Sequence, residues 1–491
     1  MTLSTSLRTQ RQRSPWDVVE TLDSVRVCSS SEKRNKMLKV AGLVFILGVG
    51  AVYLFDYITN TDVEVPQLPD THWGPSSAKK NDESVRPFVI NVPKETIDDL
   101  KSHLGRGRKF VPPLEEAAWE YGISGKYMES VVDYWKNKYD WYKRQDSLNK
   151  YPQFVTNIQG LDIHFYHVKP SEKDARKAKV VPLLLVHGWP GSVVEFQKII
   201  PMLTTARPDR DYVFEVIAPS LPGYGFSHPA VRPGLGPAQM SVVMKNLMRR
   251  LGFEKFYTQG GDWGSIITSI MASMFPDRVI GGHYNMCFVN NAKSMIYTLI
   301  SSWYPSLIVS PEHKSRVYPL GHHFSFLLRE TGYMHLQATK PDTIGNALSE
   351  SPVALATYIL EKFSTWTNPE YTKRDDGGLL EKYTMDELLD NVMIYWVTNS
   401  ITTSMRLYAE SFNHENMAAK WDDMPVKVPT ACAAFAHELA YSPEKLLKFR
   451  YKNLTQYSHF DRGGHFAAFE EPKLLAEDVW TFVGKLENKA K

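Results

Sequence analysis

The pentapeptide Gly260-Gly261-Asp262-Trp263-Gly264 has the form of a nucleophile elbow, a sharp turn from a strand into a helix that raises one side chain above a sheet. The small residues Gly260 and Gly264 permit a tight turn at that point. The central side chain is a carboxylate, where many hydrolases have a serine hydroxyl. Asp262 is therefore a candidate nucleophile, with an ordinary Gly/Asp surface turn as the alternative.

Three further groups have positions that fit such a nucleophile. The string HGWP at 187–190 follows an apolar strand, as an oxyanion-binding loop does. The backbone N–H groups of Trp189 and Trp263 are therefore candidate oxyanion donors. His465 follows the strand-like stretch TQYSHF on a loop with two glycines, which is where a general base is expected.

The acid that would orient this histidine is harder to choose. In the chain order nucleophile, acid, histidine, a carboxylate must lie at a strand end between Asp262 and His465. The stretch VKVPTACAAFAHE predicts a strand that closes on Glu438, whereas Asp461 is too close to His465 in the sequence. Glu438 is the candidate acid, and the alternative is that it is a surface turn residue.

The surrounding sequence predicts the elements that position these side chains. The string VVPLLLVHGWPGS is an apolar strand followed by a turn, and strands then alternate with helical patterns as far as 289. This alternation is typical of an α/β fold with a mostly parallel sheet, in which function lies in loops at the carboxyl ends of the strands. In the segment 85–180 the pattern predicts two helices, around 94–103 and 127–142.

Several long strings carry a resemblance to a known family. They are HGWPGS at 187–192, GGDWGS at 260–265, GYMHLQATKPDTIG at 332–345, YILEKFSTWT at 358–367 and RGGHFAAFEEP at 462–472. Together they closely resemble the microsomal epoxide hydrolases, including the juvenile hormone epoxide hydrolases of arthropods. The similarity runs to the C-terminus, whereas about 36 residues at the front are extra relative to the family pattern.

The resemblance implies a role for each site residue. Asp262 matches the nucleophile of the family, His465 its water-activating base, and Glu438 the acid that orients the base. Tyr333 and Tyr408 match the two tyrosines that hold the epoxide oxygen. From the residues alone, both tyrosines would be ordinary packing aromatics.

The resemblance also implies the architecture and the reaction. It implies an α/β-hydrolase fold with a helical cap insertion, an N-terminal wrapping domain and a single N-terminal membrane anchor. The product would be a vicinal diol, formed from a lipophilic epoxide and water without a cofactor or a metal. A carboxylate suits this reaction because its attack on an epoxide carbon leaves an ester that can be hydrolysed, whereas a serine would leave an ether.

Three other functions fit the sequence less well. A serine esterase would need a hydroxyl at position 262. A haloalkane dehalogenase-like hydrolase also uses an elbow aspartate, but its halide site lacks paired tyrosine donors. A catalytically silent hydrolase-fold binding protein usually loses elbow or base residues, and both are present here. The sequence leaves open whether the substrate is juvenile hormone or an arene or alkene oxide, and so whether the role is hormone catabolism or xenobiotic detoxification.

The composition excludes other classes of protein. Lys and Arg number 57 against 54 Asp and Glu, a net charge of +3, which gives no reason to expect a nucleic acid partner. The three cysteines are too few and too scattered to predict a disulfide framework or a zinc site.

An apolar stretch near the N-terminus predicts a membrane anchor. Residues 40–55 carry no charged side chain, and a helix begun at Met37 spans about 28 Å, enough to cross a bilayer with Lys39 at the interface. A buried core helix and a cleaved signal peptide are the alternatives. The predicted segments are a basic leader at 1–36, the anchor at 37–58, a linker at 59–84, the N-terminal domain at 85–180, the hydrolase core at 181–289 and 426–491, and the cap at 290–425.

The predicted location is the endoplasmic reticulum membrane, crossed once. Basic residues precede the anchor, so the positive-inside rule places the leader in the cytosol and the body in the lumen. A translation start at Met37 would remove most of those charges and with them the inference. The sequon Asn453-Leu454-Thr455 offers a test of a lumenal body.

Overall fold

The structure is a computed structural model that describes residues 36–40, 42–43, 45–46, 48–50, 55, 63–76 and 82–488. The chain divides into two compact units, Met1–Asp62 and Val63–Lys491. In the first unit the described residues are helical. The second unit contains the sheet, the helices that cover it and all of the predicted site residues.

The described residues form one sheet of nine strands in the order β1-β2-β3-β5-β4-β6-β7-β8-β9. The strands are β1 Arg86–Phe88, β2 Gln153–Ile158, β3 Leu161–Val168, β4 Lys179–Val186, β5 Tyr212–Pro219, β6 Phe256–Gly260, β7 Val279–Tyr284, β8 Thr430–Ala434 and β9 Leu454–His459. Strands β1, β2 and β3 pair antiparallel with one another, and β3 pairs antiparallel with β5. The remaining pairs, along β5-β4-β6-β7-β8-β9, are all parallel. The predicted α/β fold with a mostly parallel sheet is confirmed.

Both faces of the sheet are buried, which explains its long apolar runs. Side chains alternate along β4, so that Leu184 and Val186 join the core on one face, with helices α7 (Pro237–Arg250) and α8 (Asp262–Met274). Leu183 and Leu185 join the core on the other face. The helices there are α6 (Ile200–Thr204) and α19 (Pro472–Glu487).

The N-terminal segment adds strands β1, β2 and β3 and three longer helices to the body. The helices are α2 Lys94–Gly105, α3 Gly125–Asn137 and α4 Trp141–Leu148. The prediction of a single helix over 127–142 is wrong, because one helix ends at Asn137 and another begins at Trp141. Asp140 caps the new helix by accepting hydrogen bonds from the backbone N–H groups of Tyr142 and Lys143.

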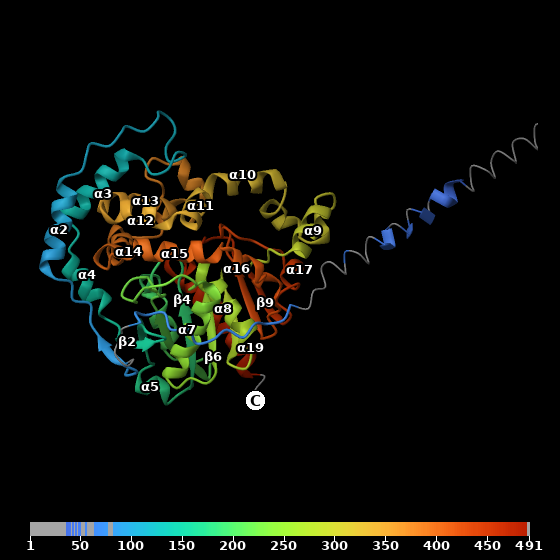
Figure 1. Ribbon diagram of the computed structural model, residues 1–491, viewed down its shortest axis with the longest axis horizontal. Helices are drawn as coiled ribbons and strands as arrows, with labels where there is room; N and C mark the ends of the chain where they lie inside the picture. The colour runs from blue at the N-terminus through green and yellow to red at the C-terminus, as the bar shows by residue number, and fades with distance from the viewer. Residues whose placement is uncertain are drawn as a thin grey trace, which may run out of the picture. The chain divides into compact units, whose positions relative to one another are not determined.

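A helical insertion separates β7 from β8, as predicted. Its main helices are α9 Ala292–Ile300, α10 Leu320–Glu330, α11 Gly332–Thr339, α12 Pro341–Ser349, α13 Pro352–Thr365, α14 Met385–Val397, α15 Ile401–Ser411 and α16 His414–Ala418. Figure 1 shows helices α10 to α15, in yellow to orange, as a layer over one end of the sheet. Shorter helices elsewhere are α5 Glu172–Ala175, α17 Glu444–Leu447 and α18 Ala467–Glu470.

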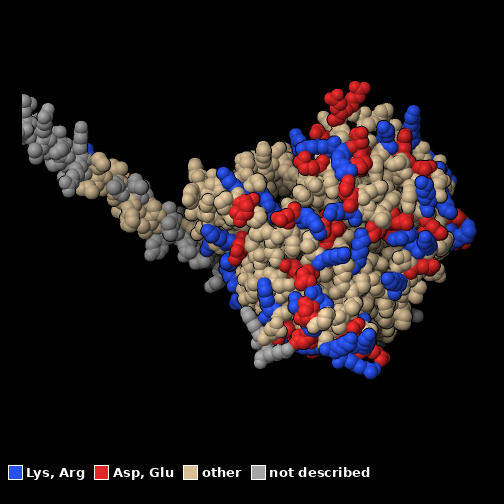
Figure 2. Space-filling model, turned by 180° about the vertical axis from the view of Figure 1, so that it is seen from behind, with Lys and Arg blue, Asp and Glu red and all other residues tan. Residues whose placement is uncertain are grey.

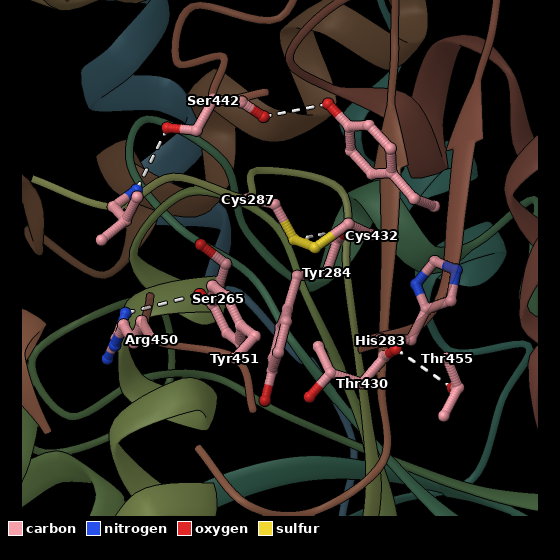
Figure 3. Close-up of a disulfide and its surroundings, with 12 residues drawn as sticks. Ser265, His283, Tyr284, Cys287, Thr430, Cys432, Ser442, Arg450, Tyr451 and Thr455 are labelled. Atoms are coloured by element: carbon pink, nitrogen blue, oxygen red, sulfur yellow. Dashed lines mark hydrogen bonds between the residues drawn. A yellow bond between two sulfur atoms is a disulfide. The ribbon is translucent and has the colours of Figure 1, made fainter. Parts of the chain in front are cut away.

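A disulfide joins Cys287 to Cys432, a pairing that the sequence does not predict (Figure 3). The two cysteines are 145 residues apart in the chain, because the whole cap lies between them. Strands β7 and β8 are nevertheless neighbours, and their register places Tyr284 beside Cys432. The two Cα atoms are 5.8 Å apart, within the range of a disulfide, and both side chains are buried.

Cys432→Ser should lower the free energy of unfolding by about 2–4 kcal/mol, because the bond closes a long loop in the unfolded chain. Denaturant unfolding without reductant measures this difference. Adding a reductant should lower the free energy of unfolding of the wild-type protein to that of the variant. The free energy of unfolding of the variant should not change. Equal stability of the two proteins without reductant would contradict the bond.

Two regions near the N-terminus bear on other predictions. Part of the segment predicted as a linker is packed, since Trp73 is buried and its backbone N–H donates to Gln159 O. The predicted anchor at 37–58 lies largely outside the described residues, and no helix within the described part of the chain is long and apolar enough to cross a membrane. On the face in Figure 2, basic and acidic side chains are intermixed, in keeping with the nearly balanced charge.

Candidate active site

The elbow predicted around Asp262 is formed where β6 ends and α8 begins. Asp262 is the first residue of α8 and has a φ of +47°, which L-residues other than glycine rarely adopt. The turn is possible because the backbones approach closely: a Cβ at Gly264 would overlap the carbonyl of Val186, and one at Gly260 would overlap Gly264. The turn thus raises the Asp262 carboxylate above the carboxyl end of the sheet.

The loop after β4 provides a hydrogen bond to this carboxylate. The backbone N–H of Trp189 donates to Asp262 Oδ1 over 2.7 Å. The second predicted donor, the N–H of Trp263, lies in the first turn of α8, where helical N–H groups have no partner inside the helix. Gly188 also contacts the carboxylate, and a Cβ there would overlap Asp262 Oδ1.

The predicted base and acid lie together beside the elbow. His465 Nε2 is 3.3 Å from Asp262 Oδ2, and Nδ1 of the same ring is 2.7 Å from Glu438 Oε1. Two loops hold this pair, the one after β8 and the one after β9, and the N–H of His437 joins them by donating to Gly463 O over 2.9 Å. The structure therefore brings Asp262 together with Glu438 and His465, which lie 176 and 203 positions further along the chain.

The charges of the two carboxylates determine the state of the histidine. Burial of the His465 ring by itself would lower its pKa, but Glu438 and Asp262 outweigh that effect and hold the pKa well above its usual range. In the resting site the imidazole is therefore positively charged between two carboxylates. If Asp262 became an ester, its charge would be lost, the pKa of His465 would fall, and a neutral base would become available.

The two predicted tyrosines come from the cap and lie over the elbow. Tyr333 of α11 stacks on the Trp189 ring, with centroids 5.3 Å apart and planes 8° apart. Tyr408 of α15 packs edge-on against Trp263 at 4.9 Å, and the two tyrosine rings are 5.8 Å apart. The Tyr408 hydroxyl is buried and has no hydrogen-bond partner among the described residues. It is therefore free to donate to a ligand.

Burial also fixes the protonation state of these phenols. It raises the pKa of both Tyr333 and Tyr408 well above 10, and the negative charge of Asp262 raises the pKa of each further. Both hydroxyls therefore remain protonated donors across the neutral range.

The structure adds aromatic residues that the sequence does not assign to the site. The Trp366 ring is 5.0 Å from Tyr333 and 5.0 Å from His465, and its carbonyl accepts from the His465 N–H. Tyr358 packs edge-on against Trp189 at 5.7 Å. Both lie in the string YILEKFSTWT, which carried the resemblance but gave no spacing signal for a role in the site.

The arrangement contains the parts for a two-step hydrolysis through a covalent ester. Asp262 Oδ1 is held by a backbone donor, which leaves Oδ2 to attack an electrophilic carbon. Two phenols can donate to a leaving oxygen above it, and a histidine paired with a carboxylate can activate water. No group of three or more metal-ligating side chains is found in the described part of the chain.

Two family models match the chain. The model described as "Epoxide hydrolase N terminus" matches residues 85–196, and the model described as "alpha/beta hydrolase fold" matches residues 181–472.

The chain is also similar to curated and solved proteins over most of its length. It is 52% identical to juvenile hormone epoxide hydrolase 1 of Ctenocephalides felis, over 91% of this chain and 95% of that protein. It is 45% identical to epoxide hydrolase 1 of Sus scrofa, over 91% of this chain and 99% of that protein. The crystal structure of juvenile hormone epoxide hydrolase from Bombyx mori matches with a TM-score of 0.84 and 48% identity, covering 86% of this chain and 99% of the other.

Proposed function

This chain belongs to the microsomal epoxide hydrolase family, which includes insect juvenile hormone epoxide hydrolases, and we propose that it converts lipophilic epoxides to vicinal diols through an ester of Asp262. It is an epoxide hydrolase of the α/β-hydrolase superfamily. The observation that carries the proposed mechanism is the Asp262 carboxylate, held between the Trp189 N–H at 2.7 Å and His465 Nε2 at 3.3 Å.

In the first step the Asp262 carboxylate opens the epoxide ring. Oδ2 attacks one ring carbon from the side opposite the ring oxygen, and the C–O bond on the far side breaks. Tyr333 and Tyr408 donate hydrogen bonds to the oxygen as its negative charge develops. Donors positioned for charge that appears only in the transition state lower the barrier rather than merely tighten binding.

In the second step water hydrolyses the ester. His465, oriented by Glu438, takes a proton from water, and the hydroxide attacks the carboxyl carbon of the Asp262 ester. The negative charge then develops on Oδ1, which already faces the Trp189 N–H, and each such donor typically contributes about 3 kcal/mol. Collapse of the intermediate breaks the ester C–O bond and restores the carboxylate, while the two alkoxide oxygens of the diol take up the proton held by His465 and the proton of the hydroxyl that was added.

A rapid-quench experiment with the wild-type protein tests this order of events. Protein-bound substrate should form before diol in the first turnover and decay as diol accumulates. Diol that forms with no preceding protein adduct would contradict the ester.

Removing either tyrosine hydroxyl should slow ring opening. We expect Tyr333→Phe and Tyr408→Phe each to reduce the single-turnover rate of ester formation by about 10- to 100-fold, because one of two donors to the developing alkoxide is lost. The rate of ester hydrolysis should be unchanged, and stopped-flow fluorescence of the site tryptophans can follow both steps. Tyr358→Phe is a suitable control, since that hydroxyl accepts from Gln337 in the cap. An effect on hydrolysis alone would contradict the role of the tyrosines.

The substrate is proposed to be an epoxidised terpenoid ester of the juvenile hormone type, with arene and alkene oxides as further substrates. The names of the insect relatives support this choice, as does the aromatic surround of Asp262. The ratio of kcat/KM for juvenile hormone to that for cis-stilbene oxide, on one preparation, tests it. A ratio well below one would favour a role in detoxification instead.

We further propose a single-pass location in the endoplasmic reticulum membrane, with segment 37–58 as the anchor and the body in the lumen. The buried Cys287–Cys432 disulfide supports an oxidising compartment for the body. Asn453 is exposed, so a lumenal body should carry a glycan that Asn453→Gln removes. Digestion of the body by protease added to sealed microsomes would contradict this orientation.

A further inference from the structure

A small cavity lies directly beside Asp262 and His465. Its volume is about 20 Å³, and its polar lining includes Glu195, Gln259, Asp262, Asn285, His465 and His187, whose two ring nitrogens already face Gly188 O and the Leu221 N–H. A buried water requires about 10–15 Å³ and two to four polar partners. The cavity therefore has the size and the chemistry to hold one water molecule.

The histidine presents a free group to this cavity. His465 Nε2 is fully buried and makes no hydrogen bond of good geometry within the described residues, although it lies 3.3 Å from Asp262 Oδ2. A water in the cavity would therefore meet the nitrogen that must remove its proton. It would also lie beside the carboxylate whose ester it attacks.

Much of the hydrogen-bonding capacity of the two amides is already used. Gln259 Nε2 donates to Asn285 Oδ1 over 2.8 Å, and Asn285 Nδ2 donates to His465 O over 3.5 Å. Once Asp262 is esterified, Glu195 is the lining residue that still has a carboxyl group to accept a hydrogen bond from the water.

The local fold places the Glu195 carboxyl in this position. Glu195 lies on the short 3₁₀ turn Val193–Phe196, which follows the loop that holds Trp189. Its side chain folds back against Gly191, where a Cβ would overlap Oε1, so the close approach requires glycine. The residue is 9% exposed and interacts electrostatically with both His465 and Asp262.

We propose that Glu195 is a positioning residue for the hydrolytic water, accepting the hydrogen that His465 does not remove. The inference rests on the ester mechanism proposed above. Burial, more than the neighbouring charge of Asp262, raises the pKa of Glu195 to about 8, whereas a positively charged His465 lowers it. The charge that His465 gains with the water proton favours ionisation of the Glu195 carboxyl, and an ionised carboxyl is the stronger acceptor for the remaining O–H of the water.

The test compares the two chemical steps in Glu195→Gln. The amide keeps the size of the side chain but cannot ionise, so the two proteins are compared at a pH above the Glu195 pKa of about 8, where the wild-type carboxyl is charged. We expect ester formation at the wild-type rate and ester hydrolysis about 10- to 100-fold slower, so that the protein adduct accumulates in the steady state. Glu195→Asp keeps the carboxyl group but withdraws it by one methylene, and should slow the same step by less.

Glu470→Gln is the matched control. Glu470 is also a buried carboxyl with its pKa raised to about 8 by burial, and it also interacts with His465, but it accepts from the Phe466 N–H and does not line the cavity. This variant should keep the wild-type ratio of the two rates. Equal slowing of both steps in Glu195→Gln, or no slowing, would overturn the role of Glu195. An adduct missing from the wild-type protein would instead refute the ester mechanism.

Discussion

Asp262→Ala should form no ester and should lose diol production by about 10⁵-fold, the scale on which hydrolases lose activity when the nucleophile is removed. The other parts of the site cannot replace the carboxylate, because His465 and the two tyrosines can only move or share protons. The loss should appear in kcat with an epoxide substrate. Binding of an unreactive analogue should be retained, because the aromatic residues around the elbow remain.

Asp461→Asn is the matched control for this experiment. Asp461 is a carboxylate four residues before His465, but it is exposed at the start of the loop that follows β9. Its replacement should leave turnover at the wild-type level. Full diol production by the Asp262→Ala protein would refute the assignment of the nucleophile.

His465→Gln should separate the two halves of the reaction. The ester should still form, because Asp262 attacks without a base, but its hydrolysis should slow by about 10⁴-fold. The protein should therefore trap one equivalent of substrate in an adduct that survives denaturation. Mass spectrometry of the intact protein, followed by peptide mapping to the peptide that contains Asp262, measures this directly.

A second histidine provides the control. His459 lies at the end of β9, six residues before His465, and its ring stacks on His313 outside the site. His459→Gln should turn over normally and trap no substrate. If His465→Gln turned over at the wild-type rate, or formed no adduct, His465 would not be the base for ester hydrolysis.

Much of the fold, and the positions of Asp262 and His465 in the site, could be predicted from local patterns. The elbow at Asp262 and the loop before His465 are short strings at strand ends, where small residues and a reactive side chain occur together. The α/β alternation is equally local, because a buried parallel strand needs a continuous apolar run. Glu438 was reached through chain order, and the structure places it 2.7 Å from the His465 ring.

What the sequence could not provide depends on contacts between distant segments. Tyr333 and Tyr408 were identified only by resemblance, because their position over the elbow depends on how the cap folds back on the core. The Cys287–Cys432 disulfide depends on two strands that are neighbours in the sheet but separated by the cap in the chain. Glu195 gave no signal at all, since its position in the water-sized cavity follows from a turn that packs against Gly191.

The central claim is that an oxygen of Asp262, and not an oxygen of solvent water, enters the substrate. A single turnover in H₂¹⁸O, with protein in excess over epoxide, tests it most directly. The account predicts that the first diol contains no ¹⁸O and that the Asp262 peptide gains one ¹⁸O atom. A first-turnover diol labelled with ¹⁸O, together with an unlabelled Asp262, would show that water attacks the epoxide directly and would contradict the account.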